Sequence, residues 1–422
     1  MTKGDHMKIT DIYTVKFRSK SCIQRDPIGH AHPGPETDSV STMYVIETDE
    51  GVKGYSMPEA YYRLNEGAAP EEWARGDVGD VTAGKTAAGT GAGYVETRLK
   101  KILVGEDPLC REKIFNILSK MQRMGANAPL SDSLLSQIDK ALWDLYGRYV
   151  GLPVWKCLGG HREKVLAYAS IQVGDHFKGG LSTPEEYAAF AKKCVDEGYP
   201  GVKLHTWADE DWSGNHWAGK PDVDKDIAAC KAVREAVGPD IELMLDCFHY
   251  YDRYDAYKLG KAIQDLGFIW YEEPMDEYNV ESYKWLKSKL DIPIIGPEVA
   301  KGKFHTRAEW VKNNVCDILR VGAGDVGGIT PMVKTVHLAE TFGIPLELHS
   351  GGSAPLHIMS MMTVPGKYYE RGMLHPFLDY GCPPWLNRPI DPMDEHGFVE
   401  VPKLPGLGYD INWDYINENR IS

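Results

Sequence analysis

Residues 241–298 read IELMLDCFHYYDRYDAYKLGKAIQDLGFIWYEEPMDEYNVESYKWLKSKLDIPIIGPE. The stretch contains three short apolar runs, and each run ends in a carboxylate: Asp246, Glu272 and Glu298. These carboxylates follow one another at equal intervals of 26 residues, with helical patterns between the runs. One strand and one helix fill such an interval. The stretch therefore predicts three parallel strands joined by helices.

The same alternation extends over the second half of the chain. Further apolar runs lie on both sides of the central stretch: VLAYAS (165–170), GVKLH (201–205), DILRV (317–321), PLELHS (345–350) and a weaker KYYE (367–370). Eight strands alternating with helices are typical of a (β/α)8-type TIM barrel. A doubly wound open sheet shows the same alternation, but rarely over eight uninterrupted units.

The first part of the chain follows a different pattern. It predicts antiparallel strands at 8–17 and 42–55, a polar loop at 23–38 between them, and helices at 94–103, 110–122 and 131–149. Strands followed by helices favour an α+β domain. We therefore expect an α+β domain over 1–140, a barrel over 141–382, and a segment over 383–422 that packs back on the first domain.

Composition and charge exclude several classes of protein. Of the 422 residues, 43% are hydrophobic and 26% charged, which is typical of a globular protein with a sizeable core. The net charge of −14 repels phosphate backbones, so no nucleic-acid partner is expected. No apolar run is long enough to span a membrane, and the charged and polar first residues make a secretion signal unexpected. The eight cysteines are dispersed, as in reduced cytoplasmic proteins. We expect a cytoplasmic enzyme.

The strand ends carry the candidate chemistry, because barrel enzymes place their active sites at the C-terminal ends of the strands. Carboxylates crowded on one rim repel one another unless a cation joins them, and their oxygens suit Mg²⁺. Asp246, Glu272 and Glu298 are therefore candidate metal ligands. The alternation of a strand does not decide whether Glu272 or Glu273 points inward.

Basic residues stand at the ends of two other strands. Lys203 and His205 lie two residues apart, so both side chains share one face of their strand. His349 ends the seventh predicted strand, across the barrel. Bases on both sides of a carboxylate site suit the removal of a proton next to a metal-bound carboxylate.

These motifs resemble those of the enolase superfamily, and specifically of its mandelate racemase subgroup. The resemblance covers nearly the whole chain, from QIDKALWDLYGRYVGLPVWKCLGG (137–160) through VKLH, LMLDCF, WYEEP, GPE, GGIT and FGIPLELHSGG in order. It implies an N-terminal α+β capping domain over a (β/α)7β modified TIM barrel. It also implies Mg²⁺ that stabilises an enediolate formed by removing a proton α to a carboxylate.

The resemblance assigns roles to residues of this chain. Because the first Glu of the EEP element is usually the ligand, the implied metal ligands are Asp246, Glu272 and Glu298. Lys203 and His205 match a Lys-x-Lys element, with His205 in the proton-transferring position. His349 matches the His of a His–Asp dyad, and Glu370 matches a position that binds the substrate carboxylate in some members.

The chain departs from the family pattern at that dyad. The Asp normally lies five residues before the GG that follows the sixth strand, and counting back from Gly327 gives Gly322. Asp325 or Asp317 could substitute, although neither is in register. A weaker base at His349 puts two-base racemisation in doubt more than it does dehydration.

The loops above the barrel carry further candidates for substrate binding: Arg25, His30 and His32 in the loop at 23–38, Trp207 in the loop at 207–224, and His249 just past the third strand. The first of these loops aligns with the one that closes over the substrate in the family. A polar, His-rich lining suits a polyhydroxylated acid, and a Trp ring can stack on a sugar face.

The sequence therefore predicts an Mg²⁺-dependent hydro-lyase of carbohydrate catabolism, an acid-sugar dehydratase acting on an aldonate or aldarate. His205 would remove the C2 proton, and His349 would protonate the departing 3-OH to give a 2-keto-3-deoxy acid. A racemase, epimerase or cycloisomerase sharing the enolisation step is the alternative among enzymes. A non-catalytic sugar-acid-binding barrel is the alternative of another class.

One motif points elsewhere. Residues 322–327, GAGDVG, match the GxGxxG pattern of dinucleotide sites. The match lies in the sixth unit of the series, where a tight turn between strand and helix explains the glycines. The expected partner is therefore a small sugar acid, without nucleic acid or membrane, and the resemblance implies a homo-oligomer from dimer to octamer.

Overall fold

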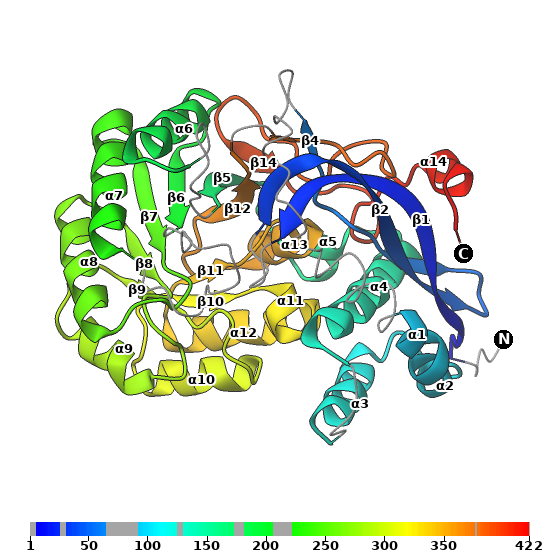
Figure 1. The fold of residues 1–422 in the computed structure, drawn as a ribbon. Helices are drawn as coiled ribbons and strands as arrows, with labels where there is room; N and C mark the ends of the chain where they lie inside the picture. The colour runs from blue at the N-terminus through cyan, green and yellow to red at the C-terminus, as the bar shows by residue number, and fades with distance from the viewer. Residues whose placement is uncertain are drawn as a thin grey trace.

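The computed structural model describes residues 6–25, 31–64, 92–124, 130–172, 181–205, 222–375 and 378–421. A barrel of strands and helices lies beside a second domain built on a long two-stranded hairpin (Figure 1). Within the described part of the chain, no helix is both long and apolar enough to cross a membrane.

The barrel contains all eight predicted strands: β5 (Lys164–Ile171), β6 (Gly201–His205), β7 (Glu242–Asp246), β8 (Trp270–Glu272), β9 (Ile294–Ile295), β10 (Leu319–Val321), β11 (Leu346–Leu348) and β12 (Tyr368–Met373). The pairings from β12 through β5 to β9 are parallel, as is the β10–β11 pair. A parallel bridge between Ile295 and Ile318 joins the two groups.

A helix follows each of the first seven barrel strands: α6 (Pro184–Asp196), α7 (Val223–Val237), α8 (Arg253–Asp265), α9 (Val280–Lys287), α10 (Phe304–Lys312), α12 (Ile329–Phe342) and α13 (Ser353–Met361). The short turn α11 (Ala323–Val326) precedes α12. The first helix shows why these segments begin where they do. Thr183 and Glu186 form a reciprocal capping box around Pro184. The order confirms the predicted (β/α)7β fold.

Apolar side chains fill the barrel below its C-terminal rim. They form one buried cluster of Tyr168, Met244, Trp270, Ile295 and Tyr368. Met244 and Trp270 come two residues before Asp246 and Glu272, so strand alternation places these carboxylates on the same inner side, nearer the rim. Asp246 and Glu272 therefore lie above this apolar layer, toward the open end of the barrel.

The second domain is built on β1 (Ile9–Arg25), β2 (Ala31–Thr48) and β3 (Lys53–Ser56), which pair antiparallel. The prediction of a loop at 23–38 is wrong over most of that range, because β1 continues to Arg25 and β2 begins at Ala31. Proline is tolerated there because Pro33 pairs only with Ile23 of β1, whereas β3 pairs further along β2.

The helices of this domain lie close to their predicted positions. They are α1 (Ala92–Tyr94) and α2 (Lys100–Leu103), joined by a π-helical turn at Val95–Leu99, then α3 (Arg111–Met124) and α4 (Asp132–Val150). The hydroxyl of Ser131 caps α4 by accepting a hydrogen bond from the Leu134 N–H.

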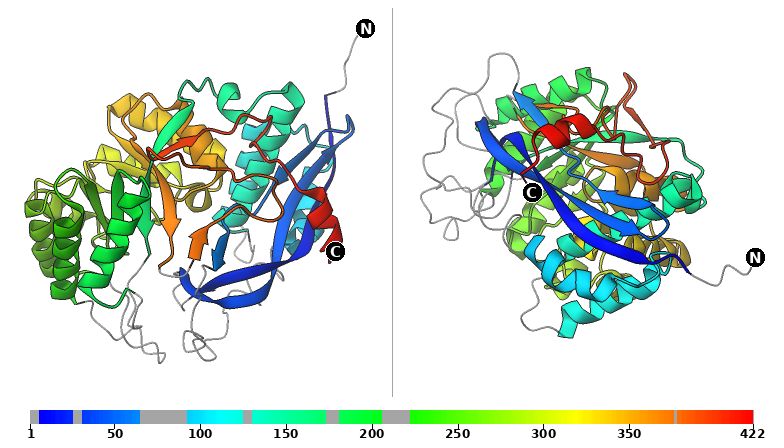
Figure 2. Two further views of the ribbon diagram at one scale, coloured as in Figure 1. Left: turned by 90° about the horizontal axis from the view of Figure 1, so that it is seen from above. Right: turned by 90° about the vertical axis from the view of Figure 1, so that its right-hand side faces the viewer.

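The C-terminal segment ties the two parts together. β13 (Leu378–Tyr380) pairs with β4 (Tyr62–Leu64), and β14 (Phe398–Glu400) pairs with β5. The backbone N–H of Arg18 donates to the Asn419 carbonyl at 2.9 Å, so α14 (Trp413–Glu418) lies against the hairpin (Figure 2). The predicted limits at residues 140 and 382 stay predictions. Helix α4 runs across the first of them.

A buried histidine in α13 makes stability depend on pH. His357 is fully buried, its Nδ1 accepts a hydrogen bond from the Trp155 N–H at 3.1 Å, and burial lowers its pKa to about 4. The unfolded chain binds this proton near pH 6.5 and the folded chain only near pH 4. Stability is therefore lost as pH falls through that window, by up to roughly 3 kcal/mol.

His357→Asn tests this effect, because the amide oxygen keeps the acceptor and does not titrate. Chemical unfolding of both proteins is measured from pH 7 to pH 4. We expect the parent to lose more stability than the variant over this range, and equal losses would contradict the assignment.

Candidate active site

Strand register brings three predicted residues side by side at the rim. His205 of β6 lies opposite Asp246 of β7, and Asp246 lies opposite Glu272 of β8. All three side chains are buried. The parallel pairing thus converts residues spaced along the chain into one polar row.

Lys203 connects this row to the last barrel strand. Its Nζ lies 3.2 Å from Asp246 Oδ2, 3.1 Å from Glu272 Oε2 and 3.1 Å from Glu370 Oε1. Burial alone would lower the pKa of Lys203, but the carboxylates of Glu272 and Glu370 hold it well above its ordinary value. The ammonium group is therefore a fixed positive charge in the site.

Arg320, on β10, is a second buried cation, which the sequence analysis missed. Its Nε lies 2.6 Å from Glu272 Oε1 and 3.1 Å from Glu298 Oε2, and its Nη2 lies 2.8 Å from Glu370 Oε2. Against the effect of burial, these carboxylates hold its pKa well above the ordinary value. The run DILRV carried a signal, because a charge inside an apolar strand is costly unless it is paired.

A metal-capable cluster lies beside these cations. Oxygens of Asp246, Glu273 and Glu298 lie within 4.8 Å of one another, and all three residues are buried. Burial raises the pKa values of Glu273 and Glu298, and the neighbouring carboxylates add to the rise at Glu273. A cation at this position would stabilise the ionised carboxylates, so the cluster fits a divalent metal.

The adjacent acid, Glu272, points toward Lys203 and Arg320. Burial raises its pKa to about 7, although both cations oppose the rise. Its assignment as the third ligand stays a prediction, because the oxygens that cluster with Asp246 and Glu298 belong to Glu273.

His205 is held with one ring nitrogen toward the carboxylates. Nδ1 lies 2.5 Å from the Ile171 carbonyl oxygen, which can only accept, so Nδ1 carries the proton of the neutral ring. Nε2 lies 3.2 Å from Asp246 Oδ2. The Phe248 ring stacks on the imidazole at 4.6 Å between centroids. The arrangement leaves Nε2 as the atom that can take a proton.

His349 approaches the cluster from another strand end. Its Nε2 lies 3.2 Å from Glu298 Oε1, and its Nδ1 lies 2.7 Å from Asp325 Oδ2. Burial would lower the pKa of His349, but Glu298 and Asp325 raise it to about 10. Since His205 contacts Asp246 and His349 contacts Glu298, the two imidazoles flank the carboxylates.

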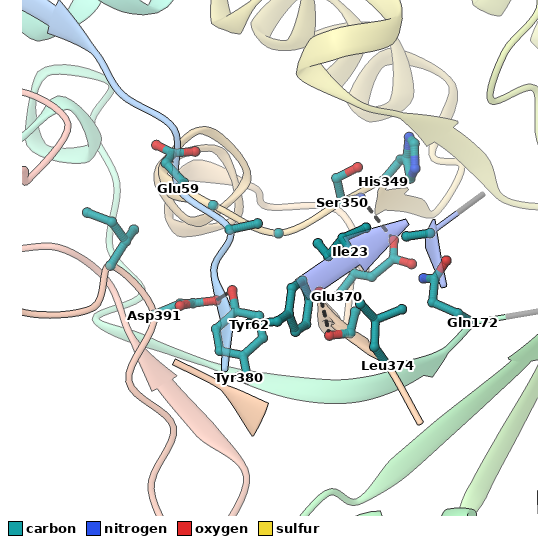
Figure 3. A pocket seen from close by; sticks show the side chains of 16 residues that line it. Ile23, Glu59, Tyr62, Gln172, His349, Ser350, Glu370, Leu374, Tyr380 and Asp391 are labelled. Carbon is teal, nitrogen blue, oxygen red and sulfur yellow. Dashed lines mark hydrogen bonds between the residues drawn. The ribbon is translucent and has the colours of Figure 1, made fainter. Parts of the chain in front are cut away.

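A cavity of about 340 Å³ opens over this side of the rim (Figure 3). Its walls come from all three parts of the chain: Ile23, Glu59 and Tyr62 from the first domain, Gln172, His349, Ser350 and Glu370 from the barrel, and Tyr380 and Asp391 from the C-terminal segment. Glu370 accepts a hydrogen bond from the Ser350 N–H at 2.9 Å. The first domain thus covers a chamber that reaches His349 and has both polar and apolar walls.

The remaining substrate-binding predictions divide into two groups. His249 is half-buried just past β7, with its N–H donating to the Glu273 carbonyl at 2.7 Å and its Nδ1 3.4 Å from Glu273 Oε1. It therefore lies on the metal-capable side. The other four lie beyond what the structure describes. His30 and Trp207 are outside the described residues, and for Arg25 and His32 only the backbone is described.

Comparison with protein families matches both parts of the chain. Residues 12–159 match the N-terminal domain of mandelate racemase and muconate lactonizing enzyme. Residues 186–415 match the domain described as enolase C-terminal domain-like.

Individual relatives carry related names. An L-talarate/galactarate dehydratase of Salmonella typhimurium is 30% identical over 78% of this chain and 75% of its own length. A D-galactarolactone cycloisomerase of Agrobacterium fabrum is 29% identical over 76% of this chain and 82% of its own length. The protein in a crystal structure of D-glucarate dehydratase from Agrobacterium tumefaciens, complexed with magnesium, is 46% identical in sequence to this chain. It covers 99% of this chain and all of its own, with a TM-score of 0.86.

Proposed function

This chain belongs to the mandelate racemase and muconate lactonizing enzyme family of the enolase superfamily, and we propose that it is an Mg²⁺-dependent acid-sugar dehydratase. The substrate would be an aldonate or aldarate, and the product a 2-keto-3-deoxy acid. The observation that carries the proposal is the pair of imidazoles, His205 and His349, on either side of a buried carboxylate cluster, with His349 also lining the cavity beside it.

Asp246 and Glu298 would hold the metal. The third ligand would be Glu272, as the resemblance implies, or Glu273, which clusters with them. Bound Mg²⁺ supplies a Lewis acid that stabilises negative charge on the substrate carboxylate. The related glucarate dehydratase was crystallised with magnesium, which supports this choice of metal.

Two histidines of the chain would each carry out one proton transfer. Nε2 of His205 takes the C2 proton, and the fixed charge of Lys203 stabilises the resulting enediolate. Nε2 of His349 then protonates the 3-OH as it leaves. The C3–O bond breaks and the hydroxyl leaves as water, and the remaining enol tautomerises to the 2-keto acid.

A cycloisomerase or epimerase is the second candidate, because the D-galactarolactone cycloisomerase is nearly as similar in sequence as the talarate/galactarate dehydratase. These reactions share the first step and differ in the product, since only dehydration yields a 2-keto acid. We also expect a cytoplasmic homo-oligomer, for which sedimentation analysis is the direct measurement.

The test is a screen of the purified protein with Mg²⁺ against C4 to C6 aldonic and aldaric acids. Each mixture is scored for 2-keto acid with semicarbazide and for C2 deuterium uptake by NMR in D₂O. We expect both signals with at least one acid. Deuterium uptake without keto acid for every acid would favour the epimerase, and silence in both assays would contradict the proposal.

A further inference from the structure

We infer that Asp325 is the positioning residue of His349, and that Gly322 is glycine because the Asp325 carboxylate occupies the space beside it. The inference rests on the proposed function, since it concerns how His349 is presented to the substrate. It also explains how this chain has a His–Asp pair although the register of the sequence offers no aspartate at the usual position.

The pair forms across two neighbouring barrel units. His349 follows β11, and its backbone N–H donates to the Val321 carbonyl at 2.9 Å at the end of β10. Asp325 lies in the turn α11 that follows β10, and its N–H donates to the Gly322 carbonyl at 3.2 Å. Both residues are thus anchored to the same strand end before their side chains meet.

The side-chain bond sets the orientation of the imidazole. Nδ1 of His349 lies 2.7 Å from Oδ2 of Asp325. An ionised carboxylate only accepts, so Nδ1 carries a proton and the opposite nitrogen, Nε2, faces Glu298, while His349 itself lines the cavity. Without this bond the ring could rotate, and Nε2 would no longer be the nitrogen presented to the site.

Gly322 provides the space for this carboxylate. Its φ of −125° and ψ of 153° are ordinary extended values, which any residue adopts, so the backbone does not require glycine. A Cβ at this position would lie 3.0 Å from both Cβ and Nδ1 of His349 and would collide with Oδ2 of Asp325. The chain can therefore hold a side chain at 322 or the carboxylate of 325, but not both.

This exclusion makes the two positions alternative sources of one carboxylate. A Cβ at 322 starts 3.0 Å from His349 Nδ1, so an aspartate there could reach the same nitrogen once the Asp325 side chain is removed. The usual dyad aspartate lies at the end of the strand. This chain instead carries its aspartate one helical turn later, on α11. An exchange of the two residues should then preserve the pair.

The experiment compares Asp325→Gly, Gly322→Asp and the double exchange with the parent, all with Mg²⁺. We expect each single variant to lose about 10- to 100-fold in kcat of keto-acid formation, with little change in KM. We expect the double exchange to recover to within about tenfold of the parent. Asp317→Asn is the matched control, because Asp317 pairs with Lys287 and with the Ile294 N–H instead.

A second readout does not depend on turnover. ¹⁵N NMR of histidine-labelled protein reports which ring nitrogen is protonated, and the His349 signals are assigned by their loss in His349→Gln. We expect protonated Nδ1 in the parent, the double exchange and Asp317→Asn, and a changed pattern in Asp325→Gly. If Asp325→Gly keeps the parent pattern and kcat, or if the single losses persist in the double exchange, the inference is wrong. If the parent turns over no sugar acid, the proposed function fails, and the NMR pattern still decides the pairing.

Discussion

Replacing His205 by glutamine is expected to lower C2 deuterium exchange and 2-keto-acid formation together, by about 10²- to 10⁴-fold. The reason is the contact of Nδ1 with the Ile171 carbonyl, which makes Nδ1 the donor to that oxygen and leaves Nε2, next to Asp246, as the nitrogen that can exchange a proton with the substrate. Glutamine fills a similar space and can still donate to that carbonyl, but it cannot take a proton. The measurement is NMR exchange and keto-acid assay on the substrate that the screen identifies.

The matched variant is His349→Gln, which removes the other imidazole. If His349 acts on the leaving hydroxyl only, this variant should keep C2 exchange and lose keto-acid formation. The pair therefore separates the two proton transfers. Exchange at the parent's rate in His205→Gln would show that His205 is not the base.

Much of the barrel could be predicted from the sequence, because each strand and helix is marked by a local residue pattern and the same pattern repeats from unit to unit. Apolar runs ending in Asp246, Glu272 and Glu298 gave the order of strands, and parallel pairing then placed these ends on one rim. The hairpin of the first domain was only partly predictable. The residues after Ala31 contain prolines that indicate a loop, and pairing with β1 overrides this local preference.

The site could be predicted only in part, because some of its side-chain contacts cannot be read from the spacing of residues along the chain. Arg320 joins Glu298 and Glu370 from a strand between them, and its inward direction follows only once the strand bounds are known. Asp325 reaches His349 from a helical turn, whereas counting back from the glycines assumes that the aspartate ends a strand. An aspartate that lies one helical turn later in the sequence is therefore missed by counting, although its carboxylate still reaches the histidine.

Replacing Asp246 by asparagine is expected to weaken Mg²⁺ binding at least about 100-fold and to reduce turnover to background at ordinary Mg²⁺ concentrations. The carboxylate belongs to the buried cluster with Glu273 and Glu298, and asparagine removes its charge without changing its size. Isothermal titration with Mg²⁺ measures the loss directly, whereas activity alone would also report the lost contacts with Lys203 and His205.

The control for Asp246→Asn is Asp139→Asn, which neutralises a buried carboxylate that accepts hydrogen bonds from Thr330 outside the rim. Its Mg²⁺ affinity should equal that of the parent. Undiminished binding by Asp246→Asn would remove this residue from the metal site.

The same titration decides between the adjacent acids, Glu272 and Glu273. Glu272→Gln and Glu273→Gln differ by one position and carry the same chemical change, but their surroundings differ. Glu272 faces Lys203 and Arg320, so its loss leaves two buried cations with fewer partners and should lower the unfolding temperature. The variant that loses Mg²⁺ affinity as strongly as Asp246→Asn identifies the third ligand. If Glu272 is that ligand, metal binding must draw its carboxylate away from Arg320, and added Mg²⁺ should then stabilise the parent far more than Glu272→Gln.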